Sequence, residues 1–287
     1  MLTKEQKAFA SKLGSISRSR SVGNVFSDWL EIAAIAMHQL PYKSGDLEKD
    51  AAFASPEANC LERMKLYSQE ELGIFSELLG MTLAAPHAGH GDFLGEIAGE
   101  AALLSKRGGQ FFTPYHLCQA ISKMTFGDVQ AAVAEKGLLT VCEPAVGAGA
   151  LVIASAEEIA SQGVDPRAHV QFDCTDISRD AFNMAYIQLS SLGLQAVVRH
   201  GNTLSMEYWE SRPTMQLLLF HQWQLRQQRS EQLTQSVKAL LSEAVTPIPE
   251  RSLPAFTPDA LDEKGKQPKP CGPKPDIVLD RQLDLFS

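Results

Sequence analysis

Apolar residues in the middle of the chain follow two alternating patterns. Short runs rich in apolar and β-branched residues predict four strands, at 138–142, 170–175, 196–200 and 215–220. Longer stretches with apolar positions three to four residues apart predict helices at 115–135, 149–161, 178–192 and 222–244. Alternation at this spacing is typical of βαβ units, so an α/β domain with a parallel sheet is predicted over 106–245.

The regions on either side of this domain have different patterns. Residues 1–105 are predicted to be mostly helical, with an apolar helix at 25–39 capped by Ser27 or Asp28, and another at 68–82. The second opens with Ser68-Gln-Glu-Glu, which is close to a capping box, and a loop is predicted at 86–91. Residues 246–287 hold eight of the fifteen prolines and are predicted to be a disordered tail.

Composition and charge limit the class of protein. With 287 residues, of which 44% are hydrophobic, the chain can bury one sizeable core. A net charge of −8 argues against a surface that is basic throughout. Residues 1–43 nevertheless carry six Lys and Arg against three acids, which leaves two interpretations open: a solvated helix face, or an arm that contacts phosphates.

The cysteine pattern and the hydropathy suggest a reducing, cytoplasmic setting. The five cysteines include no C-x-x-C pair, so neither a zinc site nor a disulfide framework is expected. Cys142 and Cys174 fall in predicted strands and are expected in the core. His87 and His90 lack neighbouring ligands, so no metal site is predicted there. We find no signal peptide and no apolar stretch long enough for a membrane.

A glycine-rich segment follows the first predicted strand. Glu143 stands at the end of that strand, and Gly147 and Gly149 come directly before a predicted helix. Such a turn lets the backbone approach a ligand closely and points the helix N-terminus at it. Asp176 closes the next predicted strand, where a carboxylate can accept hydrogen bonds from ribose hydroxyls. These residues predict a ligand of the nucleotide type without identifying it.

Three segments in order resemble a known family. The segments are Asp92-Phe-Leu-Gly-Glu, then Gly-Gly-Gln-Phe-Phe-Thr-Pro ending at Pro114, then Glu-Pro-Ala-Val-Gly-Ala-Gly-Ala from Glu143. They resemble the modification subunits of type I restriction enzymes and related adenine-N6 DNA methyltransferases. The resemblance implies a Rossmann-like class I methyltransferase sheet and S-adenosyl-L-methionine as cofactor. It covers roughly residues 88–205.

The resemblance also assigns roles to residues of this chain. Phe112, Thr113 and Pro114 would close over the methionine end of the cofactor. The methionine part would contact Glu143, Gly147 and Gly149, and the ribose would contact Asp176. Asn202 replaces the aspartate that usually faces the adenine amino group, and its carbonyl oxygen can accept the same hydrogen bond.

The catalytic part of the family pattern is missing. Where the family has a D/N-P-P-Y/F tetrapeptide after the fourth strand, this chain has His-Gln-Trp-Gln at 221–224. Gln222 could hydrogen-bond an amine and Trp223 could stack on a base that leaves the duplex, so both are candidate catalytic residues. The alternative is that Trp223 packs beneath the following helix. Too little sequence follows for the family's remaining strands, so the sheet is expected to be truncated or completed by a partner subunit.

The last residues of the chain contain a second motif. Gln282, Leu283, Leu285 and Phe286 look like the peptide by which bacterial proteins bind the DNA sliding clamp. The alternative is that these apolar residues fold back onto the surface of their own protein. Two functions therefore stay open: an adenine-N6 methyltransferase that acts on DNA, or an inactive relative serving as a DNA-binding or clamp-binding accessory or an anti-restriction factor of a phage or plasmid. A methyltransferase of RNA or protein is a third option.

Overall fold

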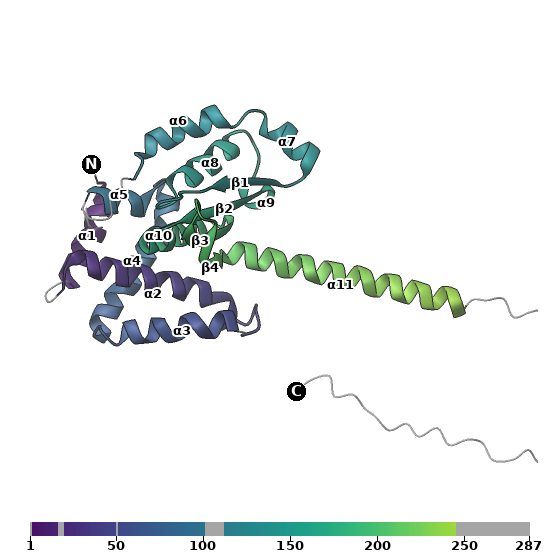
Figure 1. Cartoon of the computed structure of the whole chain (residues 1–287), viewed down its shortest axis with the longest axis horizontal. Helices are drawn as coiled ribbons and strands as arrows, with labels where there is room; N and C mark the ends of the chain where they lie inside the picture. Colours follow the sequence, from purple (N-terminus) through teal and green to yellow (C-terminus); the bar gives the residue numbers. More distant parts are fainter. Residues whose placement is uncertain (1, 17–19, 50, 101–111, 245–287) are drawn as a thin grey trace, which may run out of the picture. The chain divides into compact units, whose positions relative to one another are not determined.

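Four strands form one sheet in the same order as they occur along the chain (Figure 1). The computed structural model describes residues 2–16, 20–49, 51–100 and 112–244. Strands β1 (Leu139–Glu143), β2 (Val170–Asp176) and β3 (Gln195–Asn202) run parallel to one another. This confirms the first three predicted strands, each with its ends shifted by no more than two residues.

The fourth strand is not the predicted one. Strand β4 (Glu207–Pro213) pairs antiparallel with β3, with a register shift between His200 and Gly201. The apolar run at 215–220 instead opens helix α11 (Met215–Ala244). Thr214 ends the strand by donating its amide to Ala196 O at 2.8 Å, and its carbonyl then accepts the amide of Leu218 at 3.0 Å. A short apolar run cannot by its period distinguish a strand from a helix, and here the helix forms.

Three helices lie in the connections between the parallel strands. They are α8 (Ala150–Ser161), α9 (Pro166–His169) and α10 (Arg179–Ser191), of which α8 and α10 were predicted. The stretch at 115–135, predicted as a single helix, is divided into α6 (Tyr115–Thr125) and α7 (Val129–Lys136). Phe126 is extended at the end of α6, and the side chain of Asp128 then caps α7 by accepting the amide of Ala131 at 2.9 Å.

Helices make up the described part of the chain before α6. They are α1 (Lys4–Ile16), α2 (Val22–Lys43), α3 (Ala51–Met64), α4 (Gln69–Ala84), the 3-10 helix η1 (Ala85–Ala88) and α5 (Phe93–Glu100). The capping box at Ser68 and Glu71 is confirmed. Helix α2 begins earlier than predicted, because Ser21 rather than Ser27 or Asp28 accepts the amide of its third residue. The loop predicted at 86–91 is in part η1.

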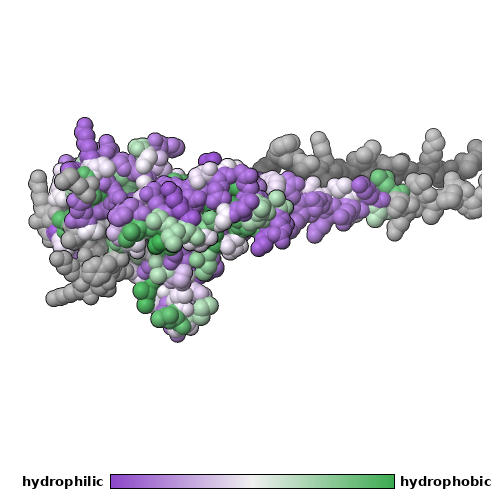
Figure 2. Space-filling model, turned by 90° about the horizontal axis from the view of Figure 1, so that it is seen from above, coloured by the Kyte–Doolittle hydropathy of each residue, from purple (hydrophilic) through white to green (hydrophobic). Residues whose placement is uncertain are grey.

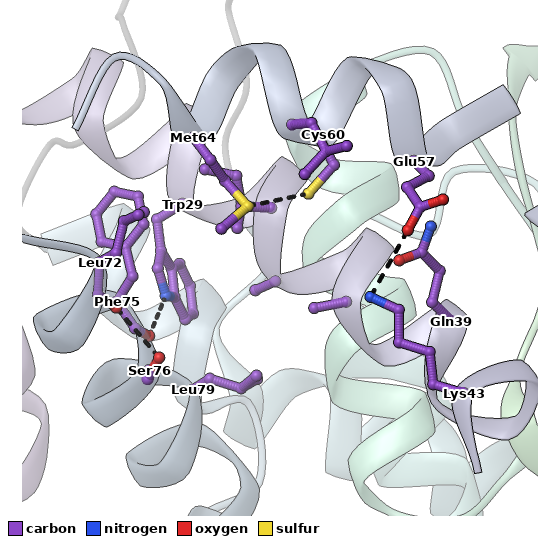
Figure 3. Close-up of a pocket in the computed structure, with 14 residues that line it drawn as sticks. Trp29, Gln39, Lys43, Glu57, Cys60, Met64, Leu72, Phe75, Ser76 and Leu79 are labelled. Carbon is purple, nitrogen blue, oxygen red and sulfur yellow. Dashed lines mark hydrogen bonds and ion pairs between the residues drawn. The ribbon is translucent and has the colours of Figure 1, made fainter. Parts of the chain in front are cut away.

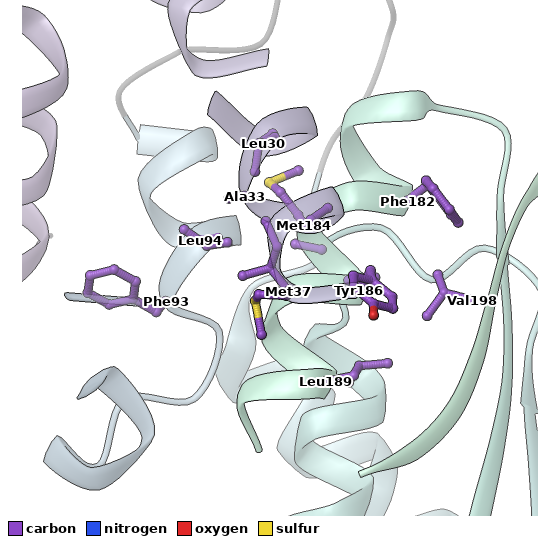
Figure 4. Close-up of a cluster of buried hydrophobic side chains, with 14 of the residues drawn as sticks. Leu30, Ala33, Met37, Phe93, Leu94, Phe182, Met184, Tyr186, Leu189 and Val198 are labelled. Carbon is purple, nitrogen blue, oxygen red and sulfur yellow. The ribbon is translucent and has the colours of Figure 1, made fainter. Parts of the chain in front are cut away.

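Helix α2 and helix α10 share one apolar core with the sheet. Figure 4 shows Leu30 and Met37 of α2 near Met184 and Tyr186 of α10, with Val198 of β3 beyond them. Residues Met1–Gln235 form one compact unit, and a second unit, Ser236–Ser287, begins inside α11. The predicted tail at 246–287 lies outside the described residues. Within those residues, no helix is long and apolar enough to span a membrane.

A cluster of ionic side chains, of which Glu31 and Arg212 are buried and Arg179 and Glu210 half-buried, joins α2, α10 and β4. Glu31 is only 4% exposed and accepts bonds from Arg179 at 2.5 and 2.8 Å and from Asn183 at 2.7 Å. Arg179 also pairs with Glu210, which in turn binds Arg212 at 2.5 Å. Removal of one member of a buried pair leaves its partner's charge without compensation, so this cluster is expected to hold α2 on the sheet unit.

An apolar cavity of about 280 Å³ lies among α2, α3 and α4 (Figure 3). Trp29 and Phe75 line it, and the indole N–H of Trp29 donates to Phe75 O at 3.1 Å. Lys43 and Glu57 also line it and lie 3.9 Å apart. None of the candidate site residues lies on these helices, so the cavity is separate from the glycine-rich turn.

Candidate functional site

The turn between β1 and α8 depends on glycine at two positions. Gly147 has a φ of +57° and Gly149 a φ of +104°, a region that side-chain-bearing residues rarely enter. Gly149 is the N-cap residue of α8, so the free amides at the start of that helix lie next to the turn. The sequence adopts this shape because β1 ends at Glu143 and the helix begins only seven residues later, at Ala150.

The turn is fastened to the neighbouring strand β2. Val146 donates its amide to Thr175 O, and Gly147 donates its amide to Asp176 Oδ2, both at 2.9 Å. The other oxygen of Asp176 accepts the amide of Ser178 at 2.8 Å, just before α10 begins. Asp176 is only 8% exposed. Its carboxylate therefore shapes the turn, and its remaining lone pairs are available for a ligand hydroxyl.

Three polar side chains stand at the carboxyl ends of the three parallel strands. They are Glu143 on β1, Asp176 on β2 and Asn202 on β3. Glu143 accepts the amide of Ala145 at 3.0 Å, and Asn202 Oδ1 accepts the amide of Leu204 at 3.0 Å. Because the carboxyl ends of parallel strands meet at one edge of a sheet, the fold brings these predicted residues to the same side.

The segment before α6 approaches the glycine-rich turn. A Cβ atom on Gly147 would lie 3.4 Å from the ring of Phe112, so the aromatic ring and the turn are in close proximity. Thr113 and Pro114 follow and are exposed, and Pro114 is the N-cap residue of α6. The fold therefore brings Phe112 next to Gly147, although these residues are far apart in the sequence.

Gly149 faces a helix rather than open space. A Cβ atom at this position would lie 3.6 Å from Leu189 and 3.7 Å from the backbone of Ala185, both on α10. The positive φ and this contact together explain why glycine stands there. Its described surroundings give Gly149 a packing role between α8 and α10, in addition to its place in the predicted cofactor motif.

The buried carboxyl group of Asp92 supports the glycine-rich turn. This residue was named above as part of a sequence motif but was assigned no role. Asp92 Oδ1 accepts bonds from Gly95 N at 3.0 Å and from Gln188 Nε2 at 2.8 Å. The same Gln188 nitrogen donates to Ala148 O at 2.8 Å, and its oxygen accepts the amide of Leu94 at 3.0 Å. Asp92 and Gln188 thus position the middle of the glycine-rich turn. The sequence signal that could have indicated this role is Gln188, a polar residue within an apolar helical stretch.

Burial raises the pKa of Asp92 to about 6, although the bonds from Gln188 and Gly95 oppose the rise. An aspartate has a pKa of about 3.9 in the unfolded chain. A raised folded-state pKa gives a stabilising contribution that is fully present below about pH 3.9 and is lost as the pH rises through about 6. Ionised Asp92 is therefore a cost to stability at neutral pH.

Asp92→Asn is expected to remove that cost, because the asparagine oxygen keeps both accepted bonds and carries no charge. The free energy of unfolding should exceed that of the wild type by about 2–3 kcal/mol at pH 8 and by much less at pH 4. Urea titrations of both proteins at the two pH values would measure the difference. A difference that is independent of pH would contradict the assigned ionisation.

The two candidate catalytic residues lie elsewhere. Gln222 and Trp223 are on α11, which follows β4, and β2 and β3 separate β4 from β1 in the sheet. Both are exposed, Trp223 by 57%, so Trp223 does not pack beneath the following helix either. The strand predicted at 215–220, which would have placed these two residues at a strand end, was wrong because this run is helical. Gln282, Leu283, Leu285 and Phe286 lie outside the described residues.

The cysteine predictions were half right. Cys174 is buried in β2, but Cys142 is exposed on β1. Thr140, on the same face of β1, is exposed as well, so this face of the strand is open to solvent in the described part of the chain. In the described part of the chain, no three His, Cys, Asp or Glu side chains are grouped as a metal site.

The fold, with helices packed on a mainly parallel sheet, defines a protein of the α/β class. The glycine-rich turn and the polar residues lie at the carboxyl edge of this sheet, which is therefore the candidate ligand site. Residues 93–223 match the family model described as N-6 DNA methylase. The matched stretch runs from α5 through the whole sheet to the first residues of α11. A comparison with curated proteins finds no match.

Proposed function

We propose that the chain binds S-adenosyl-L-methionine at the carboxyl edge of β1, β2 and β3, in a Rossmann-like methyltransferase sheet, and acts on or stays bound to DNA in the cytoplasm. The observation that carries the proposal is the turn at Gly147, fastened to Asp176 at 2.9 Å within the stretch that matches the N-6 DNA methylase model. When bound, the cofactor supplies the methyl group for an adenine amino nitrogen.

The residues at this edge fit the groups of that cofactor. The carboxylate of Glu143 suits a primary ammonium group, and Asp176 retains lone pairs for ribose hydroxyls. Asn202 offers an amide to the adenine edge, as the family resemblance implies. Phe112 lies beside Gly147, and Thr113 and Pro114 continue that segment, so these three would cover the methionine end.

The position of β4 favours a second candidate function. In the described residues no strand lies beside β1 on its outer side, and the segment with Gln222 and Trp223 is helical. A catalytic tetrapeptide at a strand end is therefore missing from this part of the chain. This supports an inactive relative that serves as an accessory bound to DNA or to the sliding clamp, or as an anti-restriction factor, or a chain that needs a partner subunit for catalysis.

Calorimetric titration of the purified chain with S-adenosyl-L-methionine tests the binding, and transfer of label from the cofactor to DNA tests the chemistry. Micromolar binding is expected. If wild-type protein methylates DNA and Gln222→Ala abolishes transfer while melting at the same temperature, the inactive-accessory function is excluded. Exposed Gln224 supplies the matched control, since Gln224→Ala changes the same helix two residues away. Absence of binding would remove the cofactor from the proposal.

The end of the chain supports a proposed contact with the DNA sliding clamp. Gln282, Leu283, Leu285 and Phe286 would enter an apolar pocket of that partner as an extended peptide. Deleting residues 282–287 should abolish capture on immobilised clamp while the melting temperature stays nearly the same. A large fall in melting temperature would instead indicate that these residues fold back onto their own protein.

A further inference from the structure

Strand β1 is an edge strand without the usual protection. Among the described residues it pairs only with β2, in register and without a bulge from Leu139 to Glu143. Its sequence, Leu-Thr-Val-Cys-Glu, contains neither proline nor a basic residue and has a single charge at its end. Natural edge strands are normally protected against pairing by charges, prolines or bulges, because an open edge accepts another strand.

The opposite edge of the same sheet has that protection. Strand β4 carries Glu207, Glu210 and Arg212, ends in Pro213, and pairs with β3 across a register shift. A charged, bulged and proline-terminated strand is poorly suited to further pairing. The difference between the two edges points to β1 as the one that pairs.

One face of the sheet near β1 also lies open. Thr140 and Cys142 point to the same side of the strand and are both exposed. Their partners in register, Gln171 and Asp173 on β2, are only half-buried. Parallel sheets are normally covered on both faces, so this end of the sheet retains room for another chain.

Apolar side chains remain uncovered on a helix at the same end of the fold. Helix α6 packs on α8, the helix after β1, through a 3.2 Å contact between Ser122 Oγ and Ser155 Oγ. Leu117, Ile121 and Met124 follow at helical spacing on α6 and are 46%, 45% and 87% exposed. A space-filling view from the side of α6 and α7 shows apolar patches within a mainly hydrophilic surface (Figure 2).

The charges at the two ends of β1 complement each other. Glu143 is at the carboxyl end. At the amino end, Lys136 is exposed, and the ring of His169 lies 3.2 Å from Gly137 O. When two such strands run antiparallel, the carboxyl end of each lies beside the amino end of the other. Glu143 of each copy then lies at the same end of the strand pair as the exposed Lys136 of the other copy.

We propose that two copies of this chain pair antiparallel along β1, with Val141 on the two-fold axis. This register gives full overlap of the two β1 strands. The two sheets then form a single sheet of eight strands, and the protected β4 strands are its outer edges. This interface goes beyond the proposed function, and its test requires neither cofactor nor DNA.

The register places Thr140 opposite Cys142 of the second copy. Opposite residues of an antiparallel pair have Cα atoms about 4.5–5.5 Å apart, within the range of about 4.4–6.8 Å that a disulfide spans. Thr140→Cys in the full-length chain should therefore form a covalent dimer on mild oxidation. The two native Cys142 residues are offset diagonally by about 7–8 Å and should cross-link poorly. A Cys271→Ser background removes the cysteine outside the described residues.

Sedimentation of the wild-type chain over a wide concentration range should give a species of twice 31.3 kDa. Ser211→Cys on β4 is the matched control, because Ser211 is also an exposed hydroxyl residue on an edge strand. At least a tenfold faster cross-link with Thr140→Cys than with Ser211→Cys is expected. A monomer at every concentration would overturn the proposal, because the partner of β1 would then be the chain's own tail or another protein. So would a dimer in which the two variants cross-link equally.

Discussion

Replacement of Glu31 by glutamine is expected to lower the free energy of unfolding by about 3 kcal/mol at pH 7. The carboxylate is 4% exposed and binds both Arg179 and Asn183. Glutamine has one oxygen to offer, and its amide nitrogen would face the guanidinium of Arg179. The positive charges of Arg179 and Arg212 would then have only Glu210 as their acid partner.

The loss should depend on pH in a defined direction. Burial acts to raise the pKa of Glu31, but the bonds from Arg179 and Asn183 outweigh it and lower the pKa to about 2. A glutamate titrates near 4.3 in the unfolded chain, so the stabilisation is present above that pH and is lost as the pH falls from about 4 towards about 2. Urea titrations of the wild type and Glu31→Gln at pH 7 and pH 3 would show the difference shrinking.

An exposed ion pair provides the control for Glu31. Glu77 lies 2.5 Å from Lys12, with side chains 58% and 46% exposed. Such a pair contributes little in water, so Glu77→Gln should change stability by less than about 0.5 kcal/mol. Equal losses at positions 31 and 77 would contradict the structural role assigned to the ionic cluster.

Gly147→Asn is expected to weaken binding of S-adenosyl-L-methionine by at least about 100-fold, equivalent to about 2.7 kcal/mol. Asparagine tolerates a positive φ better than most residues, so the backbone at φ +57° should survive the change. Its side chain would press on Phe112, 3.4 Å from the new Cβ, and occupy the approach to the turn. Calorimetry with the same cofactor would measure the loss.

Gly89→Asn is the matched control for this substitution. Gly89 also has a positive φ, +80°, in the left-handed region, but a Cβ atom there would meet nothing within 4 Å. Both variants therefore place asparagine at a positive φ, and only one alters the glycine-rich turn. Comparable affinity of the two variants for the cofactor would exclude the turn as the binding site. We prefer Gly147 to Gly149 for this test because the φ of Gly149, +104°, lies outside the left-handed region that asparagine tolerates.

The sequence was informative where local rules and burial agree. The β1 strand, the glycines after it and the acid that closes β2 could be predicted, because a buried strand, a tight turn and a helix start each require particular residues. Strand β4 escaped prediction because Glu207, Glu210 and Arg212 give it the polar composition of a loop. The role of Asp92 depends on Gln188, 96 residues away, and no local pattern reports such a contact.

The order of the strands has a consequence for how the protein is made. Each strand pairs with the one synthesised just before it, so the sheet can grow from β1 to β4 as the chain leaves the ribosome. Helix α2 is made much earlier, yet its Glu31 meets Arg179 only after 148 further residues. At ribosomal speeds of about 5–20 residues per second, α2 waits roughly 7–30 s for this partner. The face of α2 that packs on α10 therefore stays without this partner during that time, while α1, α3 and α4 can already pack on one another and on α2.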